Sequence, residues 1–275
     1  MESAGIPTSV LVGGDGPPLV LLHGPGESAF WWSRVVPDLV ADHRVVVPDL
    51  PGHGATGMPK DPLDRERVIE WLDGLVDRTC DEPPVVVGHL LGGAVAARYA
   101  IARPDALRAL VLVDGFGLSR FFPSPAFAFR LMRFMSDPSR KTYDRFLPHC
   151  MADPEGLKAE IGDSWEPFVD HYISGMQEDG SSRVGMGRLM KSFGLPRIPD
   201  ESLRRIRVPV TLVWGRHDKA VRVRVAERAS KRFGWPLHVI EDAGDDPKME
   251  RPEAFVRVLR EVVGASVQVE APRAT

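Results

Sequence analysis

Short apolar runs rich in valine, leucine and isoleucine recur along the chain and alternate with stretches whose apolar residues follow a helical period. A continuous apolar run of roughly four to eight residues is typical of a strand buried on both faces. The pattern therefore predicts a mostly parallel sheet with helices on both faces. The expected strands lie at residues 8–12, 18–22, 44–48, 84–88, 108–113, 208–214 and 236–241, and the expected helices near residues 33–41, 64–79, 91–102, 221–233 and 252–263.

The alternation stops between Gly117 and Pro199, where the pattern predicts about four helices separated by proline and glycine. We therefore expect an α/β core at residues 1–117 and 199–275 and a helical lid at residues 118–198. Thioethers adapt to irregular apolar cavities, although each methionine also has ordinary packing as an alternative role. Six of the nine methionines lie in this lid, namely Met132, Met135, Met151, Met176, Met186 and Met190.

Composition limits the classes of function. The 275 residues are 43% hydrophobic and 27% charged with a net charge of −3, which gives no reason to expect nucleic acid or an anionic membrane as a partner. No apolar run approaches the roughly 18 residues of a membrane span, and the first residues lack the basic start and apolar core of a secretion signal, so we expect a cytoplasmic protein. Two cysteines are too few for a disulfide framework or a zinc cluster. We expect no metal and no cofactor, and the oligomeric state is not indicated.

The most informative motif follows the apolar run at Val85–Val87, which leads into Gly88–Gly93 (GHLLGG) and then into a predicted helix of small residues. A strand, a Gly-x-x-x-Gly turn and a helix in this order are the layout of a nucleophile elbow, where a sharp turn exposes one side chain. In this chain that side chain is Leu90. Leucine has no lone pair and no acidic proton, so it cannot attack a substrate.

Four further segments accompany the elbow in a fixed order, at residues 19–24 (LVLLHG), 45–54 (VVVPDLPGHG), 213–218 (VWGRHD) and 241–252 (EDAGDDPKMERP). With these motifs the chain resembles the lid-bearing branch of the α/β-hydrolase superfamily, from about Pro18 to Val263. The resemblance implies the α/β-hydrolase fold, a mostly parallel central sheet with helices on both faces and a helical lid insertion.

In this superfamily a serine attacks, a histidine transfers the proton and an aspartate orients the histidine. The resemblance gives Asp218 the position of the aspartate and Asp245 the position of the histidine. These two carboxyls are expected to face one another and share a proton, which would make them a catalytic acid/base pair. Asp114, after the strand at residues 108–113, is a candidate third member. The alternative for Asp245 is a solvated loop residue.

The His-Gly turn of the resemblance carries part of the oxyanion hole, but here it is followed by Pro25, which has no N–H to donate. The amide of Leu91 then remains, unless a shifted turn uses Gly26 or Glu27. The lid histidines are candidates for replacement acids or bases, with an exposed or structural role as the alternative. The full set of candidate ligand contacts is Gly24, Pro25, Trp31, His89, Leu90, Leu91, Asp114, His149 and His171.

Three hypotheses for function remain open. The first is a non-hydrolytic enzyme, of the cyclase, isomerase or lyase type, that acts on an apolar or aromatic small molecule such as a natural-product intermediate by pocket shape and carboxylate chemistry. The second is a catalytically inactive protein that binds such a molecule. The third is a hydrolase in which Asp245 activates water. A fold cannot choose among them, because function resides in the site.

Overall fold

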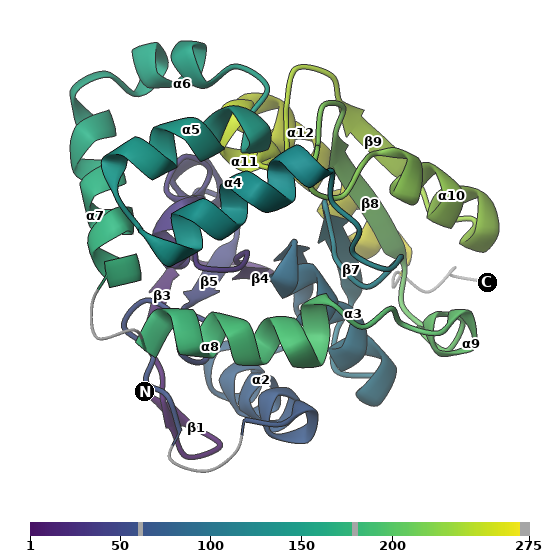
Figure 1. Ribbon diagram of the computed structural model, residues 1–275. Helices are drawn as coiled ribbons and strands as arrows, with labels where there is room; N and C mark the ends of the chain where they lie inside the picture. The colour runs from purple at the N-terminus through teal and green to yellow at the C-terminus, as the bar shows by residue number, and fades with distance from the viewer. Residues whose placement is uncertain (60–62, 178–180, 270–275) are drawn as a thin grey trace, which may run out of the picture.

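The computed structural model describes residues 1–59, 63–177 and 181–269. Its centre is a seven-stranded sheet in the order β3-β5-β4-β6-β7-β8-β9 (Figure 1). β3 is antiparallel to β5, and the other neighbouring pairs are parallel. The strands are β3 (Val10–Gly13), β4 (Pro18–Leu22), β5 (Arg44–Pro48), β6 (Val85–His89), β7 (Ala109–Val113), β8 (Val210–Gly215) and β9 (Leu237–Ile240).

The predicted fold class is confirmed, and each predicted strand overlaps one strand of this sheet. A separate two-stranded hairpin, formed by β1 (Glu2–Ser3) and β2 (Ile6–Pro7), was not predicted. Strands of two residues are too short to show an alternating pattern.

Helices cover both faces of the sheet because the strand side chains alternate between them. On β6, Val86 belongs to the apolar cluster that contains α2 and α3, whereas Val85 and Val87 belong to the cluster that contains α12. Short helices complete the core. The core helices are η1 (Ala29–Trp32), α1 (Val36–Leu39), α2 (Arg65–Thr79), α3 (Leu91–Ala102), α10 (Arg224–Phe233), α11 (Pro247–Glu250) and α12 (Pro252–Val269).

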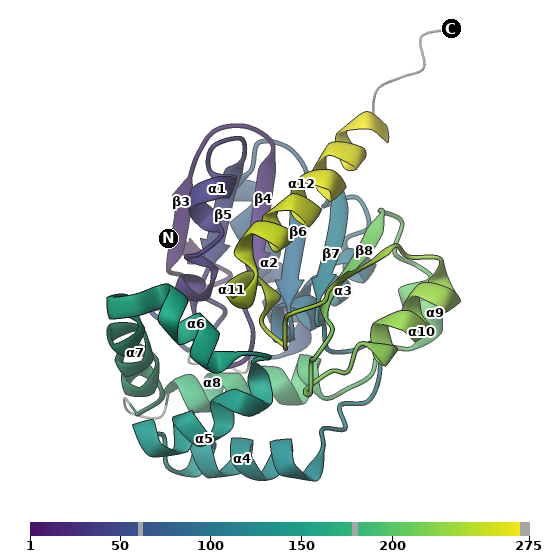
Figure 2. The same ribbon diagram turned by 90° about the horizontal axis from the view of Figure 1, so that it is seen from above.

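A group of helices between β7 and β8 lies together on one side of the core, as Figure 2 shows from above. Ser124, followed by a proline, caps the first of them, and a capping box at Ser139 begins the second. Because each such cap begins a new helix, the described part of this segment contains more helices than the four or so that the sequence predicts. The group comprises α4 (Pro125–Ser136), α5 (Arg140–Cys150), α6 (Pro154–Ile161), η2 (Gly162–Ser164), α7 (Trp165–Gln177), α8 (Ser181–Leu189) and η3 (Met190–Gly194). The short helix α9 (Asp200–Leu203) also precedes β8 but lies apart from this group and contacts α3 (Figure 2).

The division into core and lid stays a prediction at its boundaries. Residues 178–180 of the predicted lid, and residues 60–62 and 270–275 of the predicted core, lie outside the described residues. No helix within the described ranges is both long and apolar enough to cross a membrane.

Candidate active site

The elbow predicted at Leu90 is present between β6 and α3. Leu90 has φ 43° and ψ −102°, a conformation that costs a non-glycine residue about 1–3 kcal/mol. Two backbone hydrogen bonds hold it. The N–H of Leu90 donates to the carbonyl oxygen of Val113 at 2.9 Å, and its own carbonyl accepts from the N–H of Phe116 at 3.0 Å. The neighbouring strand β7 therefore fixes the turn.

Two glycines make this turn possible because the backbone packs too closely there for a side chain. A Cβ on Gly88 would lie 2.5 Å from the carbonyl of Gly92, and a Cβ on Gly92 would lie 2.3 Å from the carbonyl oxygen of Leu22. The Gly-x-x-x-Gly spacing thus allows α3 to start directly against β6 and β4. The geometry that usually presents a nucleophile is intact, and it presents a leucine.

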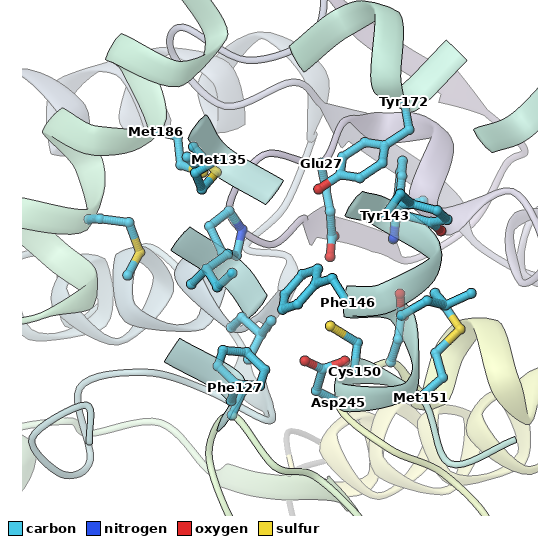
Figure 3. Close-up of a pocket in the computed structure, with 18 of the residues that line it drawn as sticks. Glu27, Phe127, Met135, Tyr143, Phe146, Cys150, Met151, Tyr172, Met186 and Asp245 are labelled. Carbon is cyan, nitrogen blue, oxygen red and sulfur yellow. The ribbon is translucent and has the colours of Figure 1, made fainter. Parts of the chain in front are cut away.

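Leu90 forms part of the wall of a cavity of about 190 Å³ between the core and the helices that follow β7 (Figure 3). Its lining is mostly aromatic, aliphatic or thioether, as expected for a site that binds an apolar molecule. The lining residues are Pro25, Glu27, Trp31, Leu90, Phe116, Phe121, Phe127, Leu131, Met135, Tyr143, Phe146, Leu147, Cys150, Met151, Tyr172, Met186, Met190, Ala220, Asp245 and Asp246.

Glu27 brings a charge to this cavity from the loop after β4. One oxygen, Oε2, accepts a hydrogen bond from the N–H of Gly24 at 2.8 Å and lies 3.7 Å from Nζ of Lys248. Burial alone would raise the pKa of Glu27, but Lys248 and His89 outweigh it, so the pKa lies below the ordinary value for a glutamate. Glu27 is therefore ionised at neutral pH, and Figure 3 shows its carboxyl among the lining side chains.

The buried ammonium of Lys248 lies next to the Glu27 carboxylate. Lys248 has no exposed surface, and its Nζ donates to Oδ1 of Asp246 at 2.5 Å and to Nδ1 of His89 at 3.1 Å. Burial would lower the pKa of Lys248, but Asp246 and Glu27 raise it above its ordinary value, so the ammonium stays charged. Since Nδ1 of His89 accepts from the ammonium, its Nε2 carries the proton that is donated to the carbonyl oxygen of Asp245, at 2.6 Å.

Asp245 is 6% exposed, and its carboxyl reaches the cavity beside the thiol of Cys150 (Figure 3). Its N–H donates to the carbonyl oxygen of Cys150 at 2.9 Å, so the loop is fixed to the end of α5. Burial, the charge of Asp218 and other nearby carboxylates raise the pKa of Asp245 well above its ordinary value. The burial of Asp245 contradicts the alternative of a solvated loop residue.

Asp218 and Asp114 lie behind the cavity and do not line it. Oδ1 of Asp218 accepts from the N–H groups of Ala220 and Val221 at 2.6 and 2.7 Å, and Oδ1 of Asp114 accepts from the N–H of Gly215 at 3.0 Å. Burial raises the pKa of Asp218 to about 6 and, together with the charge of Asp218, raises the pKa of Asp114 well above its ordinary value.

Oδ2 of Asp218 and Oδ2 of Asp114 are buried and receive no hydrogen bond from any other group, but the two carboxyls hydrogen-bond to each other, which adds to the rise in the pKa of Asp114 and offsets part of the rise in the pKa of Asp218. The described residues contain no hydrogen bond between Asp218 and Asp245, so the shared proton predicted for that pair is not observed. Their relationship is electrostatic, because the charge of Asp218 raises the pKa of Asp245.

The other predicted contacts divide into two groups. Pro25 and Trp31 line the cavity with Leu90 and Asp245. The remaining candidates do not line the cavity. The N–H of Gly24 donates to Glu27, His89 lies between Lys248 and Asp245, and Leu91 is buried in the core. In the helices that follow β7, His149 is half-buried at the end of α5, and His171 is exposed and packs against Phe30.

Sequence reasoning missed Glu27 and Lys248 as side chains. Glu27 was considered only as a backbone donor, although its position three residues after Gly24 lets its carboxylate bond back to the turn. Nothing in the sequence indicates that Lys248 is buried, since lysine is seldom fully buried. The phenols of Tyr143 and Tyr172 also line the cavity, and no pattern in the sequence marks them. No group of three or more His, Cys, Asp or Glu within the described ranges could hold a metal ion.

Residues 19–258 match the alpha/beta hydrolase family. The chain belongs to this family. It is 30% identical to a pimeloyl-[acyl-carrier protein] methyl ester esterase of Methylococcus capsulatus, over 92% of this chain and 97% of that protein. It is 26% identical to a pyrrolizixenacetamide deacetylase of Xenorhabdus hominickii, over 92% of each chain. Among solved structures it is similar to the 2-hydroxy-6-oxo-6-phenylhexa-2,4-dienoate hydrolase of Rhodococcus sp., with 27% identity, a TM-score of 0.83 and coverage of 95% of this chain and 96% of that one.

Proposed function

We propose that this member of the alpha/beta hydrolase family is a non-hydrolytic enzyme, of the cyclase, isomerase or lyase type, acting on an apolar or aromatic small molecule such as a natural-product intermediate. The single observation that carries the proposal is Leu90 on the wall of the cavity at the elbow. A covalent acyl intermediate needs a nucleophile at that point, and leucine cannot supply one. The remaining roles are shape, exclusion of water and proton transfer.

The loop after β4 also favours a non-hydrolytic function. Ester and amide hydrolysis develops an oxyanion, which family members stabilise with N–H donors. Here Pro25 has no N–H, the N–H of Gly24 is bonded to Glu27, and the Glu27 carboxylate itself lines the cavity. A fixed negative charge close to a developing oxyanion raises its energy. The site is thus unsuited to hydrolysis and suited to a neutral or positively charged transition state.

Asp245 is the proposed general acid. Burial and the nearby carboxylates raise the pKa of Asp245, which favours the protonated form that a proton donor requires. The third hypothesis requires the ionised form of Asp245, which the same raised pKa disfavours. Asp218, which does not line the cavity, is proposed to act through its charge on Asp245 as a positioning residue.

The substrates named for the relatives are not proposed for this chain. The dienoate named for the Rhodococcus hydrolase carries a carboxylate, whereas the lining of this cavity contains no lysine, arginine or histidine to receive one. Burying an unpaired carboxylate beside Glu27 would be costly.

The test is to incubate the protein with a small-molecule extract of its source organism in water enriched in oxygen-18, and to follow substrate and product by mass spectrometry. We expect a product that is isomeric with its substrate or smaller by a neutral fragment, without the heavy isotope. Incorporation of oxygen-18 would favour a hydrolase, and a retained ligand without product would favour the binding protein. Asp245→Asn should slow turnover by roughly 10²- to 10⁴-fold.

A further inference from the structure

The carboxylate of Glu27 has one oxygen occupied by the protein and one oxygen free. Oε2 accepts a hydrogen bond from the N–H of Gly24 at 2.8 Å and lies 3.3 Å from Nδ1 of His89 and 3.7 Å from Nζ of Lys248. Oε1 has no hydrogen-bond partner among the described residues. The Glu27 side chain is 9% exposed and belongs to the cavity lining, and Figure 3 shows its carboxyl among the other lining side chains.

The negative charge of Glu27 is not neutralised by its buried partner. Nζ of Lys248 lies 2.5 Å from Oδ1 of Asp246 but 3.7 Å from Oε2 of Glu27. The ammonium therefore pairs first with Asp246, and the two carboxylates share a single cation. An ionised oxygen without a partner in an apolar cavity is costly unless a ligand supplies a donor or a positive charge.

The walls around this oxygen suit a cation. Trp31 and Tyr172 pack with ring centroids 4.7 Å apart, and Tyr143 and Tyr172 with centroids 5.7 Å apart, and all three line the cavity. Aromatic faces attract ammonium groups, most strongly where water is excluded. The hydroxyl of Tyr143, a residue only 4% exposed, has no hydrogen-bond partner among the described residues.

We propose that the cavity binds an apolar or aromatic ligand that carries a protonated amine, with the amine hydrogen-bonded to Oε1 of Glu27. This assignment rests on the proposed function in that it names the substrate class of the same cavity. The amine fills the free acceptor, balances the uncompensated charge and meets the rings of Trp31, Tyr143 and Tyr172. The apolar part of the ligand packs against the methionines and phenylalanines of the lining.

Three probes of nearly the same shape test the proposal by calorimetry at neutral pH: phenethylamine, phenethyl alcohol and phenylacetate. The polar end changes among them from a cation that donates hydrogen bonds, to a neutral hydroxyl, to an anion that only accepts them. We expect the amine to bind about tenfold to a hundredfold more tightly than the alcohol, and phenylacetate to bind most weakly. Equal affinities for the amine and the alcohol would overturn the proposal.

Glu27→Gln should remove the preference for the amine and leave the affinity for the alcohol unchanged. The matched control is Glu201→Gln, on the exposed surface of α9, which should keep the preference. If Glu27→Gln does not fold because Lys248 loses a partner, Glu27→Asp serves in its place, because it keeps a carboxylate on the loop beside Lys248 but shortens the side chain that reaches the cavity, and it should weaken the preference for the amine. An amine preference that survives the loss of Glu27 would contradict the proposal.

The binding result is independent of turnover. An amine preference in a protein that transforms no compound would support this ligand class and overturn the proposed enzyme. Turnover of a substrate without a basic nitrogen, with no amine preference, would do the reverse.

Discussion

Nε2 of His89 donates a hydrogen bond of 2.6 Å to the backbone carbonyl oxygen of Asp245. His89 directly precedes Leu90, so this bond joins the elbow to the loop that carries Asp245, the residue that the sequence resemblance aligns with the family's catalytic histidine. The imidazole also accepts from Lys248 at 3.1 Å. One buried side chain therefore connects the elbow, the aspartate loop and the charge behind Glu27.

His89→Phe keeps a ring of similar size but removes both hydrogen bonds. The carbonyl oxygen of Asp245 and the ammonium of Lys248 would each lose a partner, and we expect the free energy of unfolding to fall by about 2–4 kcal/mol. Urea denaturation measures the change. His149→Phe, at the half-buried end of α5, is the control and should cost less than about 1 kcal/mol. Equal losses in the two variants would argue against the connecting role.

Lys248→Met should be among the most damaging single changes in the protein. It leaves Glu27 and Asp246 buried without their cation, for which we expect a loss of about 3–5 kcal/mol in the free energy of unfolding. Adding Glu27→Gln to Lys248→Met should recover part of that loss, because one of the two unpaired charges is removed. Strictly additive losses in this double-mutant cycle would contradict the charge pairing.

Asp218→Asn tests whether the pKa of Asp218 is raised in the folded protein, through the pH dependence of the free energy of unfolding. The folded pKa of Asp218 is about 6 against an ordinary 3.8, so the folded state binds the proton more tightly than the unfolded state. Ionisation of this group therefore destabilises the protein as pH rises from about 4 to about 6, and the cost persists above that window. We expect the variant to be more stable than the wild type by about 1–3 kcal/mol at neutral pH, with the difference lost near pH 4.

Thermal or urea unfolding across this pH range gives the comparison, with Asp15→Asn in an exposed loop as the control, where no pH-dependent difference is expected. A difference for Asp218→Asn that grows on acidification would have the wrong sign for a raised pKa.

Leu90→Ala tests whether Leu90 lines an open cavity or fills a closed core. Because Leu90 faces the cavity, its truncation should cost about 1 kcal/mol of stability while weakening the binding of phenethyl alcohol by about 1–3 kcal/mol. Leu112→Ala, at a core position of β7, should cost about 2–5 kcal/mol. If Leu90→Ala cost as much as Leu112→Ala and left probe binding unchanged, Leu90 would be a core residue.

The sequence predicted the sheet well because each strand contains a short run of apolar residues, and the central strands β4, β6, β7 and β8 are buried on both faces. It also located the elbow, since the close packing at Gly88 and Gly92 leaves a glycine pattern in the chain. The helices between β7 and β8 were less well predicted, because their number depends on local caps such as Ser124 and Ser139.

The site was predicted only in part, for a physical reason. Asp245 and Leu90 occupy positions fixed by the fold, and both line the cavity. The free oxygen of Glu27 and the complete burial of Lys248 depend on contacts between residues more than two hundred positions apart in the sequence. No local pattern carries that information.

The central claim, that no nucleophile operates at the elbow, is tested most directly by intact-mass spectrometry after incubation with a fluorophosphonate probe. We predict that the wild-type protein gains no mass, because Leu90 cannot attack phosphorus. Leu90→Ser alone should also remain unmodified, since the lining of the cavity contains no histidine to take the serine proton. Stoichiometric addition of the probe to a lining residue of the wild-type cavity would contradict the account.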